Sequence, residues 1–208
     1  MEKLYVSDRE IVTPGELLAE GIEYLPSGKA YREGDKIYAA VMSIVSVKGR
    51  VVKAIPLAGK YMPKRNDVVV GKITAVLNGG WSVEINSPYA ADLPLAEGST
   101  EFIPRGADLT RFFNIDDYIF AEVTHITETK FVKLTASRRP YRRLRDGIII
   151  EISPVKIPRI IGKQGSMVNM IKDATGCDII VGQNGWVWTK GTPEKEALVE
   201  RIVKTIEI

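Results

Sequence analysis

The sequence predicts a multidomain protein of β and α+β modules: a small β-rich N-terminal domain over residues 1–62, a five-stranded β-barrel over residues 63–140 and an α+β domain over residues 141–208. Three observations support this fold class. The chain has 208 residues, against about 100 to 200 for a usual domain. Its composition, 45% hydrophobic and 26% charged, is that of a folded globular protein. The residue pattern also changes twice along the chain, which indicates three compact modules.

The N-terminal module contains short β-type segments at residues 36–47 and 50–54. Lys48-Gly49 joins them, and Pro26-Ser27-Gly28 precedes them. About 60 residues bury little surface alone, so we expect this module to lean on its neighbours or on a partner chain.

The middle module is expected to form β-strands joined by turns and one loop. Alternating residues predict two pairs of strands, at 68–77 with 81–85 and at 118–126 with 131–136. Residues 88–102, rich in Pro, Ala and Gly, are predicted to be a loop, and residues 103–113 have a mixed pattern. Five short strands in about 75 residues suit a closed barrel of the oligonucleotide-binding (OB) type, and an open sandwich is the alternative.

The C-terminal module has the predicted order strand, helix, helix, strand, strand, helix. A β-branched strand over 148–152 is followed by a short helix that Pro158 opens and a longer helix that begins at Ser166 and ends at Gly176. Asn184-Gly185 predicts a hairpin between strands 178–181 and 186–189, because both residues tolerate positive φ. Thr192 and Pro193 then start the last helix.

The inventory of reactive side chains excludes most enzyme and metal sites. One cysteine, Cys177, and one histidine, His125, allow neither an internal disulfide nor a Cys/His zinc site. We therefore expect no catalytic residues, metal or cofactor. Asp116-Asp117 fits a solvated turn better than a carboxylate site, and His125 fits a structural or surface role. No run approaches about 20 apolar residues, so we expect no membrane segment, and the single cysteine fits a reducing, cytoplasmic setting.

The sharpest signal is Gly162-Lys163-Gln164-Gly165, which lies between two predicted helices. Two glycines let the backbone turn tightly and leave no Cβ to obstruct a sugar-phosphate chain. Exposed amides and the next helix N-terminus favour anionic oxygens, and the geometry suits four nucleotides of a single strand. The alternative is a plain turn between helices.

Residues 157–166, Ile-Pro-Arg-Ile-Ile-Gly-Lys-Gln-Gly-Ser, resemble the core of a eukaryotic-type KH domain. That resemblance implies an RNA cleft lined by Arg159, Ile160, Gly162, Lys163, Gln164 and Gly165, with Lys163 as the phosphate contact. The alternative for Ile160 and Ile161 is the core, because only one of two consecutive helix residues normally faces a given cleft.

The middle module resembles the RNA-binding barrel named after the first protein of the small ribosomal subunit. The residues concerned are 67–73, Asp-Val-Val-Val-Gly-Lys-Ile, and 132–138, Val-Lys-Leu-Thr-Ala-Ser-Arg. That resemblance implies an aromatic residue on the second strand for base stacking, and Trp81 is the candidate. Interior packing of Trp81 is the alternative.

Five arginines are concentrated between the last two modules: Arg138, Arg139, Arg142, Arg143 and Arg145. The guanidinium matches phosphate and also stacks on bases, so the run favours contact with RNA or with an acidic protein surface. Arg65, Arg105 and Arg111 would extend it. A solvated junction is the alternative. Residues 141–208 carry 11 basic and 8 acidic side chains, so the positive surplus lies at this end.

The order of the three modules, together with residues 13–18 and 61–71, is similar to the RNA-binding cap subunits of the archaeal exosome, the ribosomal RNA processing protein four family. The resemblance covers essentially the whole chain. It implies a non-catalytic subunit, three copies of which sit on a hexameric ring of phosphorolytic 3'-to-5' exoribonuclease chains. Such a subunit guides single-stranded RNA into the ring's pore for degradation and processing.

Two alternatives stay open at this point. One is a free-standing single-stranded RNA-binding factor in translation or RNA maturation, which the same motifs fit. The other is an RNA-modifying enzyme, for which the sequence offers no catalytic constellation.

Overall fold

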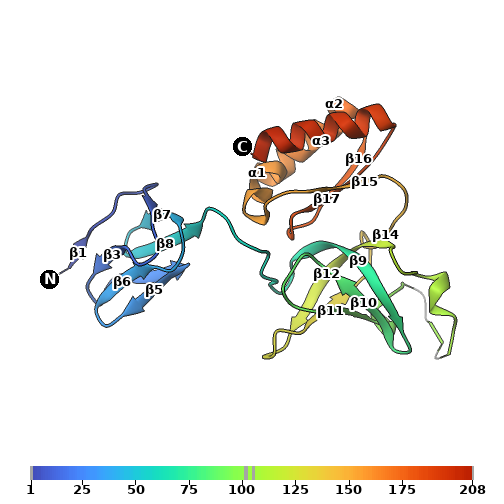
Figure 1. The fold of residues 1–208 in the computed structure, drawn as a ribbon, viewed down its shortest axis with the longest axis horizontal. Coiled ribbons are helices and arrows are strands. Elements are labelled where there is room, and N and C mark those ends of the chain that lie inside the picture. The colour runs from blue at the N-terminus through green and yellow to red at the C-terminus, as the bar shows by residue number, and fades with distance from the viewer. Residues whose placement is uncertain (1, 101–102, 105, 208) are drawn as a thin grey trace. The chain divides into compact units, whose positions relative to one another are not determined.

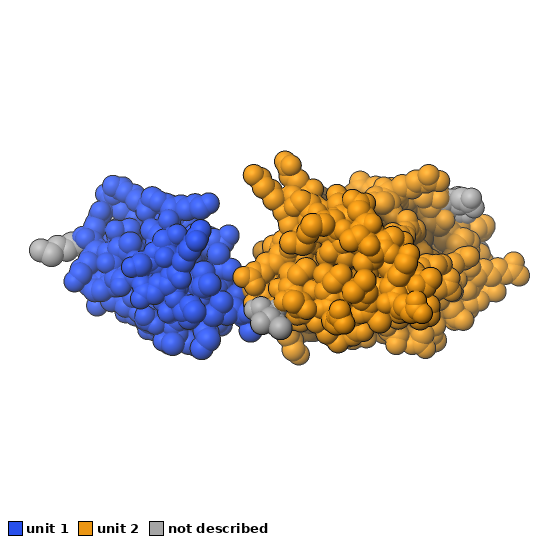
Figure 2. Space-filling view, turned by 90° about the horizontal axis from the view of Figure 1, so that it is seen from above, with its two compact units in different colours: residues 1–59 blue, residues 60–208 orange. Residues whose placement is uncertain are grey.

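The computed structural model describes residues 2–100, 103–104 and 106–207. The chain divides into two compact units, Met1–Gly59 and Lys60–Ile208, which Figure 2 colours separately. The second unit contains both the barrel and the α+β domain (Figure 1).

The described part of the first unit forms two four-stranded sheets. Their strand orders are β1-β3-β6-β5 and β2-β7-β8-β4. The strands are β1 (Lys3–Leu4), β2 (Ile11–Val12), β3 (Leu17–Glu20), β4 (Leu25–Gly28), β5 (Ala30–Glu33), β6 (Lys36–Ala39), β7 (Ser43–Lys48) and β8 (Val51–Pro56). A cluster of buried side chains, including Leu18, Ile37 and Val45, fills the space between them. This unit therefore has a hydrophobic core of its own.

One expectation for this unit is wrong. Residues 36–47 are not one segment, because the chain leaves β6 after Ala39 and enters β7 at Ser43. Residues 26–28 belong to β4, which pairs in parallel with β8. Because β4 is an edge strand, the missing N–H of Pro26 is tolerated. Gly28 has φ 68°, and a Cβ there would lie 2.3 Å from the carbonyl oxygen of Ala54, so the close pairing requires glycine.

The barrel of the second unit is closed, as predicted. Its strands are β9 (Val68–Leu77), β10 (Gly80–Glu84), β11 (Ala91–Pro94), β12 (Tyr118–Ile126) and β13 (Val132–Thr135). Each pairs with the next around the ring in the order β9-β10-β11-β13-β12, and β12 returns to β9. Strand β14 (Arg142–Leu144) adds to β12 outside the ring, and two short 3-10 turns are η1 (Leu95–Glu97) and η2 (Leu109–Arg111).

The predicted loop over residues 88–102 contains the fifth barrel strand, so that prediction is wrong at residues 91–94; residues 101 and 102 lie outside the described part. Ala91 and Leu93 are buried while Asp92 between them is half-buried, which is the alternation of a strand. The strand is only four residues long and ends at Pro94, and this hides it in the sequence. It closes the barrel by pairing with β10 and β13.

The C-terminal domain follows the predicted order of elements. These are β15 (Ile148–Glu151), η3 (Pro154–Lys156), α1 (Ile157–Ile161), η4 (Lys163–Gly165), α2 (Ser166–Thr175), β16 (Asp178–Val181), β17 (Trp186–Lys190) and α3 (Pro193–Glu207). The strands form one sheet in the order β15-β17-β16, and the helices lie over one face of it (Figure 1). As predicted, Gly176 ends α2 in a left-handed conformation, with φ 68°.

The other face of this sheet packs on the barrel. Successive strand residues point to opposite faces, so Val187 joins the core under the helices while Trp186 and Trp188 join a second cluster with Val70 and Leu144. Both faces of β17 are therefore buried, and the barrel and the C-terminal domain form one compact unit.

Candidate nucleic-acid interface

The Gly-x-x-Gly segment forms a tight turn between α1 and α2 that requires glycine. Gly162 has φ 72° and ψ 178°, a region that only glycine adopts readily. A Cβ on Gly162 would lie 2.7 Å from the backbone nitrogen of Met167. Gly165 has φ 81°, and the intervening Gln164 is also left-handed, with φ 55°. The backbone therefore reverses direction in four residues.

The turn presents Lys163 and Gln164 to solvent. Among the described residues neither side chain has a hydrogen bond or ion pair. Helix α2 begins directly behind the turn without a side-chain cap, and the positive end of its dipole favours an anion there. Residues 152–172 contain four basic residues and no acidic one, which gives this edge of the domain a positive potential.

The structure corrects one predicted cleft residue, Ile160. Its side chain is 0% exposed and packs in the core of the domain. Ile161 is half-buried and lines a groove instead. The reason is the helical geometry of α1, since successive residues are about 100° apart around the axis and Ile157 and Ile160 share the inward stripe.

That groove has a volume of about 370 Å³ and lies along α1, α2 and the edge strand β16. Its lining combines apolar and charged side chains from the C-terminal domain with three residues of the barrel side: Phe120, Pro140, Arg142, Ile161, Val168, Lys172, Asp178, Ile179, Ile180 and Val181. Sequence reasoning missed Lys172 as a groove residue. The i, i+4 spacing of Val168 and Lys172 on α2 is the signal that would have identified it.

The five arginines between the barrel and the C-terminal domain do not form one continuous basic surface. Arg138 pairs with Glu122 at 2.6 Å, Arg142 with Asp178 at 2.8 Å and Arg143 with Asp117 at 2.5 Å. Arg139 and Arg145 are exposed and have no ion pair within the described residues. Arg142 borders the groove, whereas Arg143 and Arg145 line a different cavity of about 380 Å³ beside Asp116, Asp117 and Asp146. Three of the five are thus engaged in ion pairs within the structure.

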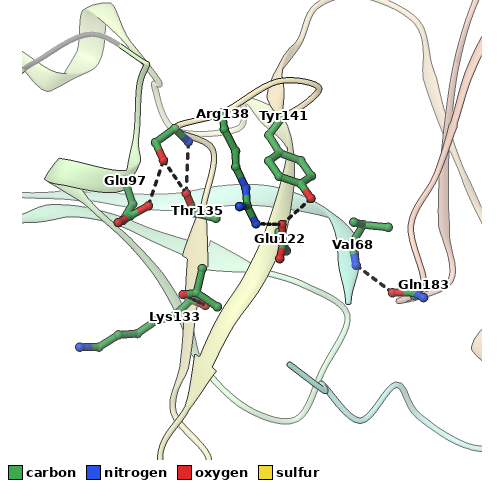
Figure 3. A network of polar contacts seen from close by, with 10 residues as sticks. Val68, Glu97, Glu122, Lys133, Thr135, Arg138, Tyr141 and Gln183 are labelled. Atoms are coloured by element: carbon green, nitrogen blue, oxygen red, sulfur yellow. Dashed lines mark hydrogen bonds and ion pairs between the residues drawn. The ribbon is translucent and has the colours of Figure 1, made fainter. Parts of the chain in front are cut away.

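The contact of Arg138 belongs to a polar network on the barrel wall (Figure 3). The carboxylate of Glu122, 11% exposed, accepts hydrogen bonds from Arg138 at 2.6 Å and from the Tyr141 hydroxyl at 2.5 Å. The Tyr141 bond and then Arg138 outweigh burial and hold the pKa of Glu122 below its usual range. Burial and the Glu122 bond raise the pKa of Tyr141 to about 12. The network fixes the start of the arginine run to β12.

Trp81 does not offer a stacking surface in this structure. The residue is 1% exposed, its Nε1 donates to the carbonyl of Phe113 at 3.0 Å, and its ring meets Phe113 edge-on at 5.1 Å. A Cβ on Gly98 would lie 2.3 Å from the indole ring, so the ring is covered closely. A ring without an open face cannot stack on a base. Trp81 is therefore packed in the interior of the barrel, which is the alternative given above.

Of the remaining polar candidates, Asp116, Asp117 and Arg111 have partners within the structure. Asp116 pairs with Lys72 at 2.8 Å in a turn, and Asp117 accepts from the backbone amide of Asn114. His125 is exposed on β12. Of the other arginines, Arg65 is exposed, Arg111 pairs with Asp108, and Arg105 lies outside the described residues.

The described residues hold no group of three or more His, Cys, Asp or Glu side chains placed to bind a metal ion. None of their helices is both long and apolar enough to cross a membrane.

Three family models match successive parts of the chain. The exosome RNA binding protein RRP4 N-terminal domain matches residues 9–58, the RRP4 S1 domain matches residues 60–125, and the KH domain matches residues 147–195. Their order is that of the three folded modules.

Curated relatives match over the whole chain. The chain is 44% identical over 204 residues to the exosome complex component Rrp4 of Methanobrevibacter smithii, and the alignment covers 98% of this chain and 67% of the relative. It is 42% identical over 205 residues to Rrp4 of Methanothermus fervidus, covering 98% and 90%. The chain spans 64% of the length of the Methanothermobacter thermautotrophicus relative. A crystal structure described as a candidate exosome complex RNA-binding protein matches with a TM-score of 0.64 and 35% identity, covering 72% of this chain and 86% of that one.

Proposed function

Because this chain belongs to the Rrp4 family of archaeal exosome components, we propose that it is a non-catalytic cap subunit that binds single-stranded RNA and guides it into the pore of the exosome. The observation that carries this proposal is the exposed Lys163-Gln164 pair in the Gly-x-x-Gly turn of the KH domain, whose side chains bond to nothing in the part of the chain that the structure describes. The glycines let the turn approach the sugar-phosphate backbone without a Cβ, Lys163 supplies a cation, and Arg159, exposed on α1, supplies a second one.

The proposed partner is a hexameric ring of phosphorolytic ribonuclease-type subunits in the cytoplasm, with three copies of this chain per ring. The first unit would dock on it. That unit leaves several large apolar side chains exposed, among them Ile22 at 82% and Ile11 at 61%. These side chains are our candidates for the contact with the ring.

The RNA part of the proposal is tested by replacing Lys163 and Gln164 together with Asp in the full chain. We expect affinity for a short single-stranded RNA to fall at least about tenfold, because two anions replace a phosphate contact. The matched control is Lys195→Asp with Ala197→Asp, which changes the charge equally at exposed positions on α3. Equal affinities for the two double variants would count against the turn as the RNA site.

The assembly part is tested by tagging the chain in its native host, purifying it at low salt and counting the co-purifying chains by mass. Two ribonuclease-type subunits at equal stoichiometry would support the ring. Recovery alone or with ribosomal components would favour a free-standing RNA-binding factor.

A further inference from the structure

The groove beside the Gly-x-x-Gly turn has walls from two domains. The C-terminal domain contributes Ile161, Val168 and Ile180, which are half-buried and apolar. The barrel side contributes Phe120 of β12 and Arg142 of β14. A nucleotide in this groove would therefore contact both domains at once.

The barrel wall is held firmly against the C-terminal domain. Asn184, at the tip of the β16–β17 hairpin, hydrogen-bonds the backbone N–H and carbonyl of Val70 and the carbonyl of Ile85. Gln183 bonds the backbone of Val68 through both its amide N–H and its side chain. Phe120 itself packs on Tyr141 with ring centroids 5.4 Å apart. The groove is thus a pre-formed site whose two walls keep their spacing.

The chemistry of the lining suits a nucleobase. Its apolar side chains and the Phe120 ring match the faces of a planar base, and Arg142 and Lys172 place two cations at its rim. The acid that lines it, Asp178, is paired with Arg142 at 2.8 Å. Both partners are about half exposed, 51% and 49%, so the pair is weak enough for Arg142 to turn to a base edge or a phosphate.

We infer that this groove is a composite nucleobase site, in which one base of single-stranded RNA lies between the C-terminal domain and the barrel, and that Phe120 and Arg142 help to determine base preference. The inference rests on the proposed function, since it names the residues that read the RNA gripped by the Gly-x-x-Gly turn. A duplex would not fit this role, because its paired bases present no free face to the groove.

The test compares affinities of the full chain for equal-length homopolymers of A, C and U. Arg142→Ala and Phe120→Leu should each lower the affinity for the preferred homopolymer at least about fivefold. They should also reduce the difference in affinity between the homopolymers. Arg142→Lys keeps the charge but loses the planar fork, so it should restore part of the affinity and not the preference. The control is Arg201→Ala, which removes an equal charge from an exposed position on α3 that does not line the groove.

The readout separates this inference from the proposed function. If the Phe120 and Arg142 variants keep both affinity and base preference while the Lys163/Gln164 double variant loses binding, the composite site is overturned and the proposed function stands. If that double variant also binds RNA normally, the result contradicts both the composite site and the proposed function. Thermal unfolding checks each variant, and if Phe120→Leu fails to fold, the half-exposed Arg142 decides the question alone.

Discussion

Asn184 shows how much one side chain contributes to the arrangement of the RNA-binding unit. It is 0% exposed and donates to the carbonyls of Val70, at 2.7 Å, and Ile85, at 3.1 Å, while accepting from the amide of Val70 at 3.2 Å. The sequence predicts a turn here because Asn184 and Gly185 both tolerate positive φ, and of the two Gly185 adopts it. The side chain of Asn184 replaces a missing strand partner for the barrel.

We therefore expect Asn184→Ala to lower the free energy of unfolding of the second unit by about 2 to 4 kcal/mol, because it leaves buried backbone groups unpaired. Urea unfolding followed by tryptophan fluorescence measures this, since Trp81, Trp186 and Trp188 all lie in that unit. Gln183→Ala, which removes one side-chain bond at a half-buried position, should cost clearly less. Equal effects of the two substitutions would contradict this account.

The Glu122–Tyr141 hydrogen bond predicts a pH dependence of stability. Because the pKa of Glu122 is lowered in the folded state, this carboxylate stabilises the fold at pH values above its unfolded-state pKa of about 4.3. That stabilisation is lost as pH falls through the folded-state pKa. Because the pKa of Tyr141 is raised to about 12, the neutral hydroxyl stabilises the fold fully below its unfolded-state pKa of about 10. That stabilisation is lost as pH rises toward 12.

Tyr141→Phe should accordingly lower the free energy of unfolding by about 1 to 2 kcal/mol between roughly pH 5 and pH 9, and by less on either side. Denaturation across this range measures the difference from the natural chain. Tyr31→Phe, an exposed position in the first unit, serves as the control. A difference that does not vary with pH would rule out the assigned bond as its source.

The α1–turn–α2 element depends on its two glycines for different reasons. A Cβ on Gly162 would collide with the backbone of Met167, whereas a Cβ on Gly165 would meet no atom nearer than 3.6 Å. Gly165 is therefore required only by its φ of 81°, which costs another residue about 1 kcal/mol. A residue that replaces Gly162 would have both the strained φ and the collision with Met167.

We expect Gly162→Ala to destabilise the second unit by about 2 to 4 kcal/mol and Gly165→Ala by about 1 kcal/mol. Thermal or urea unfolding ranks the two, and RNA affinity should follow the same order because a shifted turn moves Lys163. The reverse order would show that the turn is held differently.

For the whole molecule, RNA binding should depend on salt in proportion to the number of phosphate contacts. The slope of log affinity against log salt is about −0.7 per contact for a single strand. If Lys163, Arg159 and Lys172 each neutralise a phosphate, the slope is about −2, and Lys163→Ala reduces its magnitude by about 0.7. Titrations between low and moderate potassium chloride measure it, and an unchanged slope in Lys163→Ala would remove this residue from the contacts.

The amino-acid sequence by itself determined the features that depend on neighbouring residues. The order of elements in the C-terminal domain, the end of α2 at Gly176 and the strand at Tyr118–Ile126 follow from glycine, proline and periodic apolar residues within a few positions. These signals act through local backbone geometry, which is why they can be predicted without the fold. The Gly-x-x-Gly turn belongs to the same class.

Only the tertiary structure decided where side chains point and which distant groups they meet. It made Ala91–Pro94 a strand, since this short segment is held by pairing with β10 and β13. It buried Trp81 and Ile160, exposed Ile161 to the groove and paired Arg142 with Asp178, 36 residues away. Burial and pairing depend on partners far along the chain, and the local pattern carries no information about those distances. The wall that the barrel adds to the groove exists only because two domains pack together.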